Sequence, residues 1–175
     1  DRHGRIDIEE LKSLVKDNTI STLVSLMHAN NEIGTIQDIK SIGDACADFG
    51  ALFHCDTVQT IGKYEIDLST SNISFLSGSG HKIYGPKGAG FLYVNGNNII
   101  RPLIVGGGQE RNMRSGTENT YGIAGLAEAL DNISENRAVY STQINILVDR
   151  FKANIGALDL DIQYNGCPEN YLPHI

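Results

Sequence analysis

Tryptophan is absent from this chain of 175 residues, and cysteine occurs only three times. An odd number of cysteines, without a CxxC pair or metal-ligand spacing, is typical of a reducing compartment rather than of a disulfide framework. We therefore expect a cytoplasmic protein without a metal site. Cys46 in a predicted helix and Cys55 in a predicted strand are expected to be small core residues, whereas Cys167 lies in a predicted turn and is expected to be exposed.

Positive charge and long apolar runs are also scarce. The 14 Lys and Arg residues are outnumbered by 21 Asp and Glu residues, which gives a formal net charge of -7. Such a balance disfavours a non-specific nucleic-acid or anionic-membrane binder, although small anions can still bind locally. No apolar run approaches the roughly 20 residues that a membrane-spanning helix needs. The 41% apolar and 20% charged residues instead indicate an ordinary globular domain.

Neither end of the chain has the features of a complete domain. Position 1 is Asp1, and the chain stops at 172–175 (LPHI), where a strand would start. We interpret the sequence as part of a longer polypeptide, with residues 1–150 forming a partial large domain and 151–175 the start of a smaller C-terminal domain.

Helical and strand patterns alternate along the first part of the chain. Residues 7–16 and 39–49 have apolar positions at helical spacing, with Asp7 and Asp38 as N-caps and Gly50 as a stop. Between and after these helices, 22–27, 51–55 and 73–76 are predicted to be buried strands. This alternation predicts an α/β fold: a three-layer, mixed but mostly parallel sheet with helices on both faces.

The second half of the chain is predicted to be more irregular. Asn95 and Gly96 indicate a hairpin between strands at 90–94 and 99–105, which would be antiparallel. Helices are predicted at 121–133 and 140–155. A final strand is predicted at 159–163.

Polar residues follow the predicted parallel strands, at the edge of the sheet where α/β proteins bind ligands. Asn31 follows the first strand, and Asp56 and Gln59 follow the second. The third strand leads into a glycine-rich bend at 77–90 (SGSGHKIYGPKGAG) that contains Ser79, His81 and Lys82. We expect these side chains to converge on one site.

Lys82 is the candidate nucleophile of this bend. A lysine in a tight turn between apolar strands is expected to be poorly solvated, which favours its neutral, nucleophilic form. The alternative is a solvated loop lysine. The bend has neither the Gly-x4-Gly-Lys-Ser/Thr spacing of a P-loop nor the Gly-x-Gly-x-x-Gly of a dinucleotide-binding helix, so neither of these phosphate sites is predicted.

A second glycine-rich loop, at 106–119 (GGGQERNMRSGTEN), carries two arginines. Long polar loops in compact domains are usually functional or disordered. Arg111 and Arg114 could hold a carboxylate or phosphate, or could pair with Glu110 and Glu118 at the surface. The sequence alone leaves both possibilities open.

An amine, a carboxylate and amide side chains at neighbouring strand ends suit pyridoxal phosphate. A lysine forms a Schiff base with the aldehyde, and a carboxylate keeps the pyridine nitrogen protonated. Amides can contact the ring phenolate, while Ser and His can hold the phosphate. Each residue also has a structural alternative: an Asx turn for Asp56, and loop hydrogen bonds for Asn31 and Gln59.

Four ordered segments carry a family resemblance. The segments 28–34 (HANNEIG), 54–59 (HCDTVQ), 77–88 and 106–119 closely resemble the cysteine desulfurase family of iron-sulfur cluster assembly. This family belongs to the class V aminotransferase branch of fold-type I pyridoxal-phosphate enzymes. The match covers most of the chain, in order and at family-like separations.

The resemblance implies a role for each candidate residue. Lys82 resembles the Schiff-base lysine, Asp56 the pyridinium partner, and Asn31 and Gln59 the contacts to the phenolate. Ser79 and His81 resemble phosphate ligands, with His81 also beside the reacting lysine as a catalytic group. Thr117 resembles the threonine that reaches the phosphate in the other subunit of a homodimer.

The implied activity is conversion of L-cysteine to L-alanine, with sulfur passed through an enzyme persulfide to an iron-sulfur scaffold or another acceptor protein. By the resemblance, the persulfide cysteine lies beyond residue 175, and neither Cys55 nor Cys167 matches it. Three alternatives stay open: a selenocysteine lyase or other class V aminotransferase or lyase, a non-catalytic truncated paralogue, and an aldolase-type lyase that uses Lys82 alone.

Overall fold

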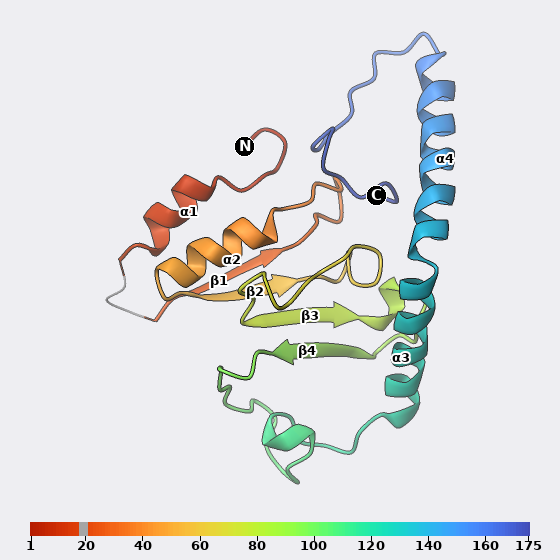
Figure 1. Cartoon of the computed structure of the whole chain (residues 1–175). Coiled ribbons are helices and arrows are strands. Elements are labelled where there is room, and N and C mark those ends of the chain that lie inside the picture. The colour runs from red at the N-terminus through yellow and green to blue at the C-terminus, as the bar shows by residue number, and fades with distance from the viewer. Residues whose placement is uncertain (18–20) are drawn as a thin grey trace.

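A four-stranded mixed sheet forms the centre of the computed structural model, which describes residues 1–17 and 21–175. Its strands are β1 (Leu23–Met27), β2 (Leu52–Asp56), β3 (Phe75–Ser79) and β4 (Gly90–Val94), arranged in that order (Figure 1). β1, β2 and β3 are parallel, and β4 is antiparallel to β3. The prediction of a mixed, mostly parallel α/β sheet is confirmed.

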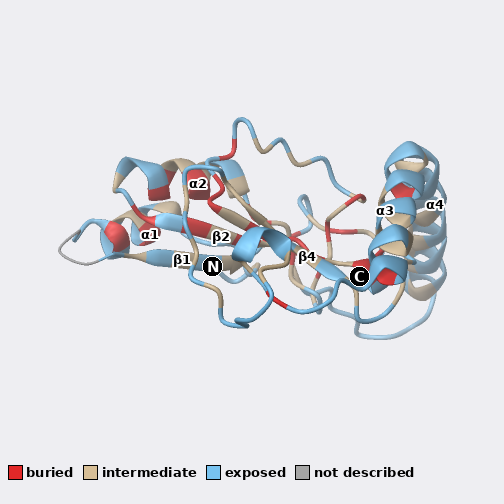
Figure 2. Ribbon diagram, turned by 90° about the horizontal axis from the view of Figure 1, so that it is seen from below, coloured by how far each residue is buried: buried red, intermediate tan, exposed pale blue. Residues whose placement is uncertain are grey.

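Two helices cover one face of this sheet and form the core with it (Figure 2). They are α1 (Ile8–Val15) and α2 (Ile39–Asp48), and both begin at the predicted caps. Asp7 accepts the backbone N–H groups of Glu9 and Glu10, and Asp38 accepts that of Ser41. The buried cluster between helices and sheet comprises Leu11, Val15, Ile42, Ala45, Cys46, Ala51, Phe53, Cys55, Ile73 and Leu76.

The other two helices stand at the carboxyl end of β3 rather than over the second face of the sheet (Figure 1). α3 (Thr120–Glu135) and α4 (Arg137–Gly156) confirm the helices predicted at 121–133 and 140–155. The face of the sheet opposite α1 and α2 exposes apolar strand residues, including Leu23 and Leu92. Among the described residues, the helical cover expected on both faces is therefore formed on one face.

The apolar side of α4 has little cover. Leu147 is 60% exposed and Phe151 is 59% exposed. α4 also runs through the predicted domain boundary at residue 150 without a break. The division into 1–150 and 151–175 stays a prediction.

Two predicted strands are wrong. Residues 99–105 and 159–163 have no strand structure, and β4 pairs with β3 instead of forming a hairpin with 99–105. Phe91 and Tyr93 of β4 pack against the core, which fixes β4 beside β3. In the 99–105 segment Pro102 has no N–H to donate to a ladder, and Leu103 remains 96% exposed.

Cys167 is also a correction, because it is buried rather than exposed. Its backbone N–H donates to the hydroxyl of Thr35. The surrounding segment returns to the loop after β1, where Leu172 donates to the carbonyl of Gly34 and Ile36 to that of Asn170. This contact between distant parts of the chain has no local sequence signal. Within the described residues, no helix is long and apolar enough to cross a membrane.

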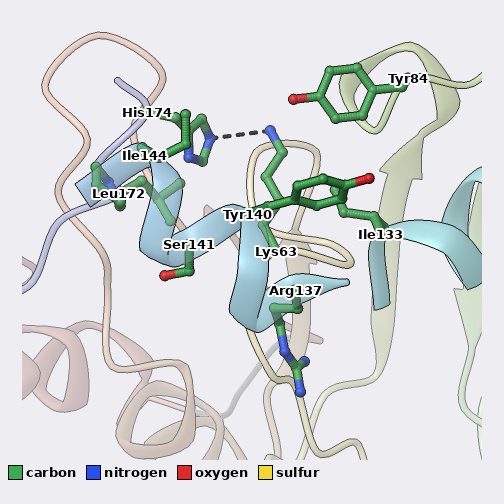
Figure 3. A pocket seen from close by; sticks show the side chains of 10 residues that line it. Lys63, Tyr84, Ile133, Arg137, Tyr140, Ser141, Ile144, Leu172 and His174 are labelled. Atoms are coloured by element: carbon green, nitrogen blue, oxygen red, sulfur yellow. Dashed lines mark hydrogen bonds between the residues drawn. The ribbon is translucent and has the colours of Figure 1, made fainter. Parts of the chain in front are cut away.

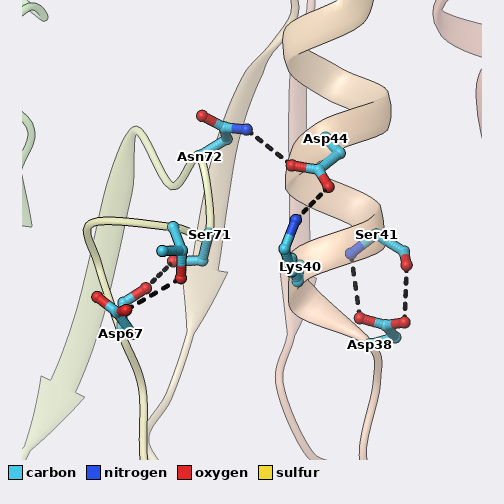
Figure 4. Close-up of polar contacts among 8 residues, drawn as sticks. Asp38, Lys40, Ser41, Asp44, Asp67, Ser71 and Asn72 are labelled. Carbon is cyan, nitrogen blue, oxygen red and sulfur yellow. Dashed lines mark hydrogen bonds and ion pairs between the residues drawn. The ribbon is translucent and has the colours of Figure 1, made fainter.

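The α2 helix lies unusually close to the loop before β3. Asn72 donates to Asp44 Oδ1 over 2.8 Å, and Lys40 pairs with the other carboxylate oxygen (Figure 4). Gly43 faces the same loop, and a Cβ at this position would lie 1.9 Å from the carbonyl oxygen of Ser71. The helix can approach this closely only because residue 43 lacks a side chain.

We predict that Gly43→Ala lowers the free energy of unfolding by about 2 kcal/mol, because the backbone around Ser71 must move. Gly156→Ala is the matched control, since a Cβ there meets no atom within 4 Å. In a helix it should be neutral or stabilising by up to ~1 kcal/mol. Urea unfolding measures both, and equal effects of the two substitutions would contradict the close approach.

Candidate active site

The carboxyl ends of three strands meet at one edge of the sheet (Figure 1). In the ladder, Asp56 lies between Met27 of β1 and Ser77 of β3. Asp56 and Ser77 share a face of the sheet, and Ser79 is on that face two residues further along, at about 7 Å of strand length. The side chains of Asp56 and Ser79 are therefore carried on one face, which is opposite α1 and α2.

Asp56 is half-buried. It forms the Asx turn that the sequence offered as a structural alternative to a ligand contact. Its Oδ1 accepts the N–H of Val58 over 2.9 Å. This Asx turn holds the carboxylate at the end of β2 and occupies one of its two oxygens. Because a carboxylate accepts several hydrogen bonds, the turn and a ligand contact are compatible.

A polar chain that the sequence analysis did not identify crosses the sheet beside Asp56. His54 lies two residues before Asp56, on the same face. Its Nδ1 is 2.8 Å from the hydroxyl of Ser25 on β1, and its Nε2 is 3.2 Å from that of Ser77 on β3. The chain joins the three parallel strands just before the candidate site. The alternation of Ser25 and His54 with apolar neighbours, and the position of Ser77 after an apolar run, are the signals that could have revealed it.

Asn30 and Asn31 have different roles in the loop after β1. The side chain of Asn30 accepts the N–H groups of Glu32 (2.9 Å) and Ile33 (3.0 Å), which closes the turn. Asn31 is exposed. The loop hydrogen bonds considered for Asn31 are therefore made by Asn30. The exposed amide of Asn31 remains available for a ligand.

His28 fixes the turn that carries Gln59. Its Nδ1 is 3.0 Å from the hydroxyl of Thr60, which in turn donates to the carbonyl of Thr57 over 3.3 Å. Since this hydroxyl has one hydrogen, Nδ1 of His28 is the donor of the pair. The ring of Tyr64 packs edge-on against His28 at 5.1 Å. Burial lowers the pKa of His28 from 6.5 to about 4, so the imidazole is neutral near pH 7.

Lys82 ends a short 3₁₀ turn, Gly80–Lys82, directly after β3. The side chain of Lys82 is exposed. The expectation that a tight turn would leave this lysine poorly solvated is therefore wrong for this chain. The bend keeps the backbone tight, since Gly80 accepts the N–H groups of both Ile83 (3.0 Å) and Gly85 (2.9 Å), but its outer side is open.

The glycines of the bend serve the packing of the protein itself. A Cβ on Gly78 would lie 2.4 Å from a ring carbon of Phe91, and one on Gly90 would lie 2.7 Å from the carbonyl oxygen of Gly78. Both distances are shorter than any normal carbon contact. These two glycines therefore allow β3 and β4 to pair, rather than allowing a ligand to approach.

Ser79 and His81 form a local pair next to Lys82. The hydroxyl of Ser79 is 3.1 Å from Nδ1 of His81, and the ring of His81 is exposed. Together they offer a hydroxyl and an imidazole on the open side of the bend. This is a donor set that can bind phosphate oxygens.

Thr117 is exposed, and no hydrogen bond among the described residues joins it to Ser79, His81 or Lys82. The loop 106–119 that carries it runs beyond the β4 edge of the sheet to the start of α3 (Figure 1). In the same loop, Arg114 donates to the carbonyl of Ser115, and none of the ion pairs of the described residues joins Arg111 or Arg114 to Glu110 or Glu118. The surface-pairing alternative for these arginines is not seen.

The three cysteines are free and buried. Burial raises the pKa of the Cys46 thiol to about 11 and, together with the nearby charge of Asp56, that of Cys55 to about 12. Thiolates are the reactive form, so Cys46 and Cys55 are unsuited to nucleophilic attack. The described residues contain no group of three His, Cys, Asp or Glu side chains arranged to hold a metal ion.

A model of the family described as Aminotransferase class-V matches residues 1–165. The chain belongs to this family. The family relationship covers all the strands and every candidate residue of the site, including the loop that carries Thr117.

The most similar proteins include several cysteine desulfurases. The cysteine desulfurase IscS of Clostridium botulinum is 45% identical over 166 residues, which is 95% of this chain and 41% of that protein. The putative cysteine desulfurase IscS 1 of Bacillus subtilis is 41% identical over 175 residues, which is 46% of its length. The resemblance to the cysteine desulfurase family is confirmed, and the chain spans less than half the length of these relatives.

Solved structures agree with this relationship. A structure described as a NifS-like protein superposes with a TM-score of 0.91 at 38% identity, over 99% of this chain and 47% of that one. A structure of SspA in complex with cysteine matches 75% of this chain and 38% of its own, with a TM-score of 0.71 and 41% identity. The sheet and the loops at its strand ends thus have the same fold as in these related structures.

We predict that the stability of the protein falls between pH 6.5 and pH 4 in part because of His28, whose pKa is lowered from 6.5 to about 4. In this window the histidine is protonated in the unfolded chain but stays neutral in the folded protein. The contribution of His28 to the free energy of unfolding is therefore complete above pH 6.5, the pKa of the unfolded histidine. It falls by up to about 3 kcal/mol as the pH drops to 4.

Urea unfolding at several pH values checks this. His28→Asn should be less stable at pH 7 and should lose stability less steeply on acidification. His81→Asn, at an exposed histidine, is the matched control and should keep the wild-type slope. An unchanged slope in His28→Asn would show that another group is responsible.

Proposed function

We propose that this chain supplies the coenzyme-binding half of a pyridoxal-phosphate-dependent cysteine desulfurase. The observation that carries the proposal is the ladder that sets Asp56 beside Ser77, on the same face as Ser79, with Lys82 in the turn directly after β3. The similarity to cysteine desulfurases supports the choice of reaction within the class-V family.

The donor set fits the coenzyme on chemical grounds. An exposed primary amine, a carboxylate with one oxygen left by its Asx turn, and a hydroxyl–imidazole pair lie on adjacent strand ends. These groups match an aldehyde, a pyridine nitrogen and a phosphate in turn. When bound, pyridoxal phosphate supplies an electron sink for the substrate carbanion.

Each residue has a role in this proposal. Lys82 would hold the coenzyme covalently and, once displaced by L-cysteine, would move the α-proton of the substrate. Asp56 would hold a proton at the ring nitrogen, and the His54 chain beside it would keep β1, β2 and β3 in register. Asn31 and Gln59 would contact the phenolate oxygen, and Ser79 and His81 the phosphate.

Two roles require atoms outside a single copy of this chain. Thr117 is exposed and makes no hydrogen bond to Ser79, His81 or Lys82 among the described residues, so it is free to contribute to the phosphate of a second subunit in a homodimer. All three cysteines are buried, and the thiol pKa values of Cys46 and Cys55 are raised, so we assign the persulfide to a cysteine outside these 175 residues. Sulfur would then pass from that persulfide to a scaffold or other acceptor protein.

We predict that the full-length protein binds pyridoxal phosphate with the visible absorbance of the lysine-bound coenzyme, and that Lys82→Ala abolishes this absorbance. Lys87→Ala is the matched control, because it removes an exposed lysine from the same glycine-rich bend. It should bind the coenzyme as the wild type does. Absorbance that survives Lys82→Ala would contradict the assignment of the lysine.

The reaction is tested separately. The full-length protein supplied with L-cysteine should release alanine and, in the presence of a thiol reductant, sulfide in equal amounts. Lys82→Ala should reduce both rates at least about a thousandfold, because the amine is both the coenzyme ligand and the proton carrier. Transfer of the amino group to a keto acid without sulfide release would instead indicate an aminotransferase.

A further inference from the structure

A small cavity lies beside the candidate active site, between α3, α4 and the C-terminal segment (Figure 3). Its volume is about 110 Å³. None of the residues proposed to bind the coenzyme lines it. Its walls are mainly apolar side chains of Ile133, Ile144, Leu172 and Pro173, and its main charged group is the ammonium of Lys63.

The backbone brings Lys63 into this position. Gly62 has a φ of +73°, and a Cβ there would lie 2.3 Å from a methyl carbon of Ile133. The turn after β2 therefore lies directly against α3, and the next residue, Lys63, projects between the two helices and the C-terminal segment (Figure 3). Buried Leu172 fixes that segment by donating to the carbonyl of Gly34 over 2.9 Å.

Lys63 carries a half-buried charge whose partner is uncharged. Its Nζ donates to Nε2 of His174 over 3.1 Å. The surrounding atoms and the charge of Lys63 lower the pKa of His174 to about 4, so at pH 7 this imidazole is a neutral acceptor. Burial, followed by the charge of Lys82, lowers the pKa of Lys63 itself.

Arg137 also lines the cavity but carries the same charge as Lys63, so it cannot neutralise it. Arg137 points away from it (Figure 3), and its guanidinium is 3.3 Å from the carboxylate of Glu65. Lys63 forms none of the ion pairs found among the described residues. A half-buried ammonium without a counter-charge is energetically unfavourable, and an anion in the cavity would relieve this cost.

We propose that this cavity binds a short-chain monocarboxylate. An ammonium has three N–H donors, and one of these is used by His174, so two can reach a carboxylate. The hydroxyl of Tyr84 points toward the same ammonium (Figure 3) and adds a further donor. The alkyl part of the ligand lies against Ile133, Ile144 and Leu172, where water contacts are unfavourable.

The chemistry of the cavity favours a carboxylate over a phosphate. One unpaired ammonium matches a single negative charge, whereas phosphate sites usually have arginines or several backbone N–H groups. Inorganic phosphate has no apolar part that could pack against the apolar walls, whereas the alkyl chain of a carboxylate can pack there. The volume of about 110 Å³ limits the ligand to a few carbon atoms.

Propionate is the probe for this site. Saturation-transfer NMR of the full-length protein at pH 7 should show propionate binding, with its methyl protons close to Ile133, Ile144 and Leu172. Lys63→Met should weaken the affinity measured by calorimetry at least about tenfold, because it removes the charge. Lys16→Met, at an exposed lysine of similar length, is the matched control and should bind as the wild type does.

A second variant guards against a folding defect in Lys63→Met. Ile144→Glu places a carboxylate in the cavity opposite Lys63 and should exclude propionate while circular dichroism stays that of the wild type. The proposal is overturned if the wild type does not bind propionate, or if folded Lys63→Met binds it unchanged. It is equally overturned if inorganic phosphate binds more tightly than propionate at Lys63.

Discussion

The parallel register of β1, β2 and β3 is the constraint on which the site depends. Parallel strands end at the same edge, so the residue after each strand is brought to one place regardless of its distance along the sequence. Here the ladder sets Asp56 beside Ser77 and leads directly to Ser79 and Lys82. A slip of one residue in β2 would turn Asp56 to the face covered by α1 and α2.

Two sets of contacts hold this register. On one face, Phe53 and Cys55 are fully buried beneath the helices, so β2 cannot rotate without exposing them. On the other face, His54 links Ser25 and Ser77 across the three strands. The second face, which carries the candidate site, exposes apolar residues such as Leu23 and Leu92. The packed core on one face of the sheet therefore supports a candidate site on the opposite face, which is exposed.

Much of the architecture could be predicted because its signals are local. The caps at Asp7 and Asp38, the three parallel strands and the two C-terminal helices each follow from short patterns. The prediction that the first strand is buried is wrong, because β1 has no buried residue. The errors involve long-range contacts. The Asn95–Gly96 turn suggested a hairpin, but packing of Phe91 and Tyr93 beside β3 decided the pairing. Cys167 is buried through Thr35, which is 132 residues away.

The candidate site shows the same limit. Sequence order could place Asp56 and Lys82 at strand ends, but the exposure of Lys82 depends on what covers the open side of the bend. The assignment of a structural role to Asn30 rather than Asn31 depends on which side chain turns inward. The lack of a counter-charge near Lys63 could not be predicted, because it depends on how α3 and the C-terminal segment pack around this residue.

The most direct test of the account is to identify the lysine that carries the coenzyme. Reduction of the pyridoxal-phosphate-loaded protein with borohydride fixes the coenzyme to its lysine, and peptide mapping by mass spectrometry locates the modified residue. We expect the pyridoxyl group on Lys82. Its appearance on Lys63 or Lys87, with Lys82 unmodified, would contradict the convergence of the strand ends on one reacting amine.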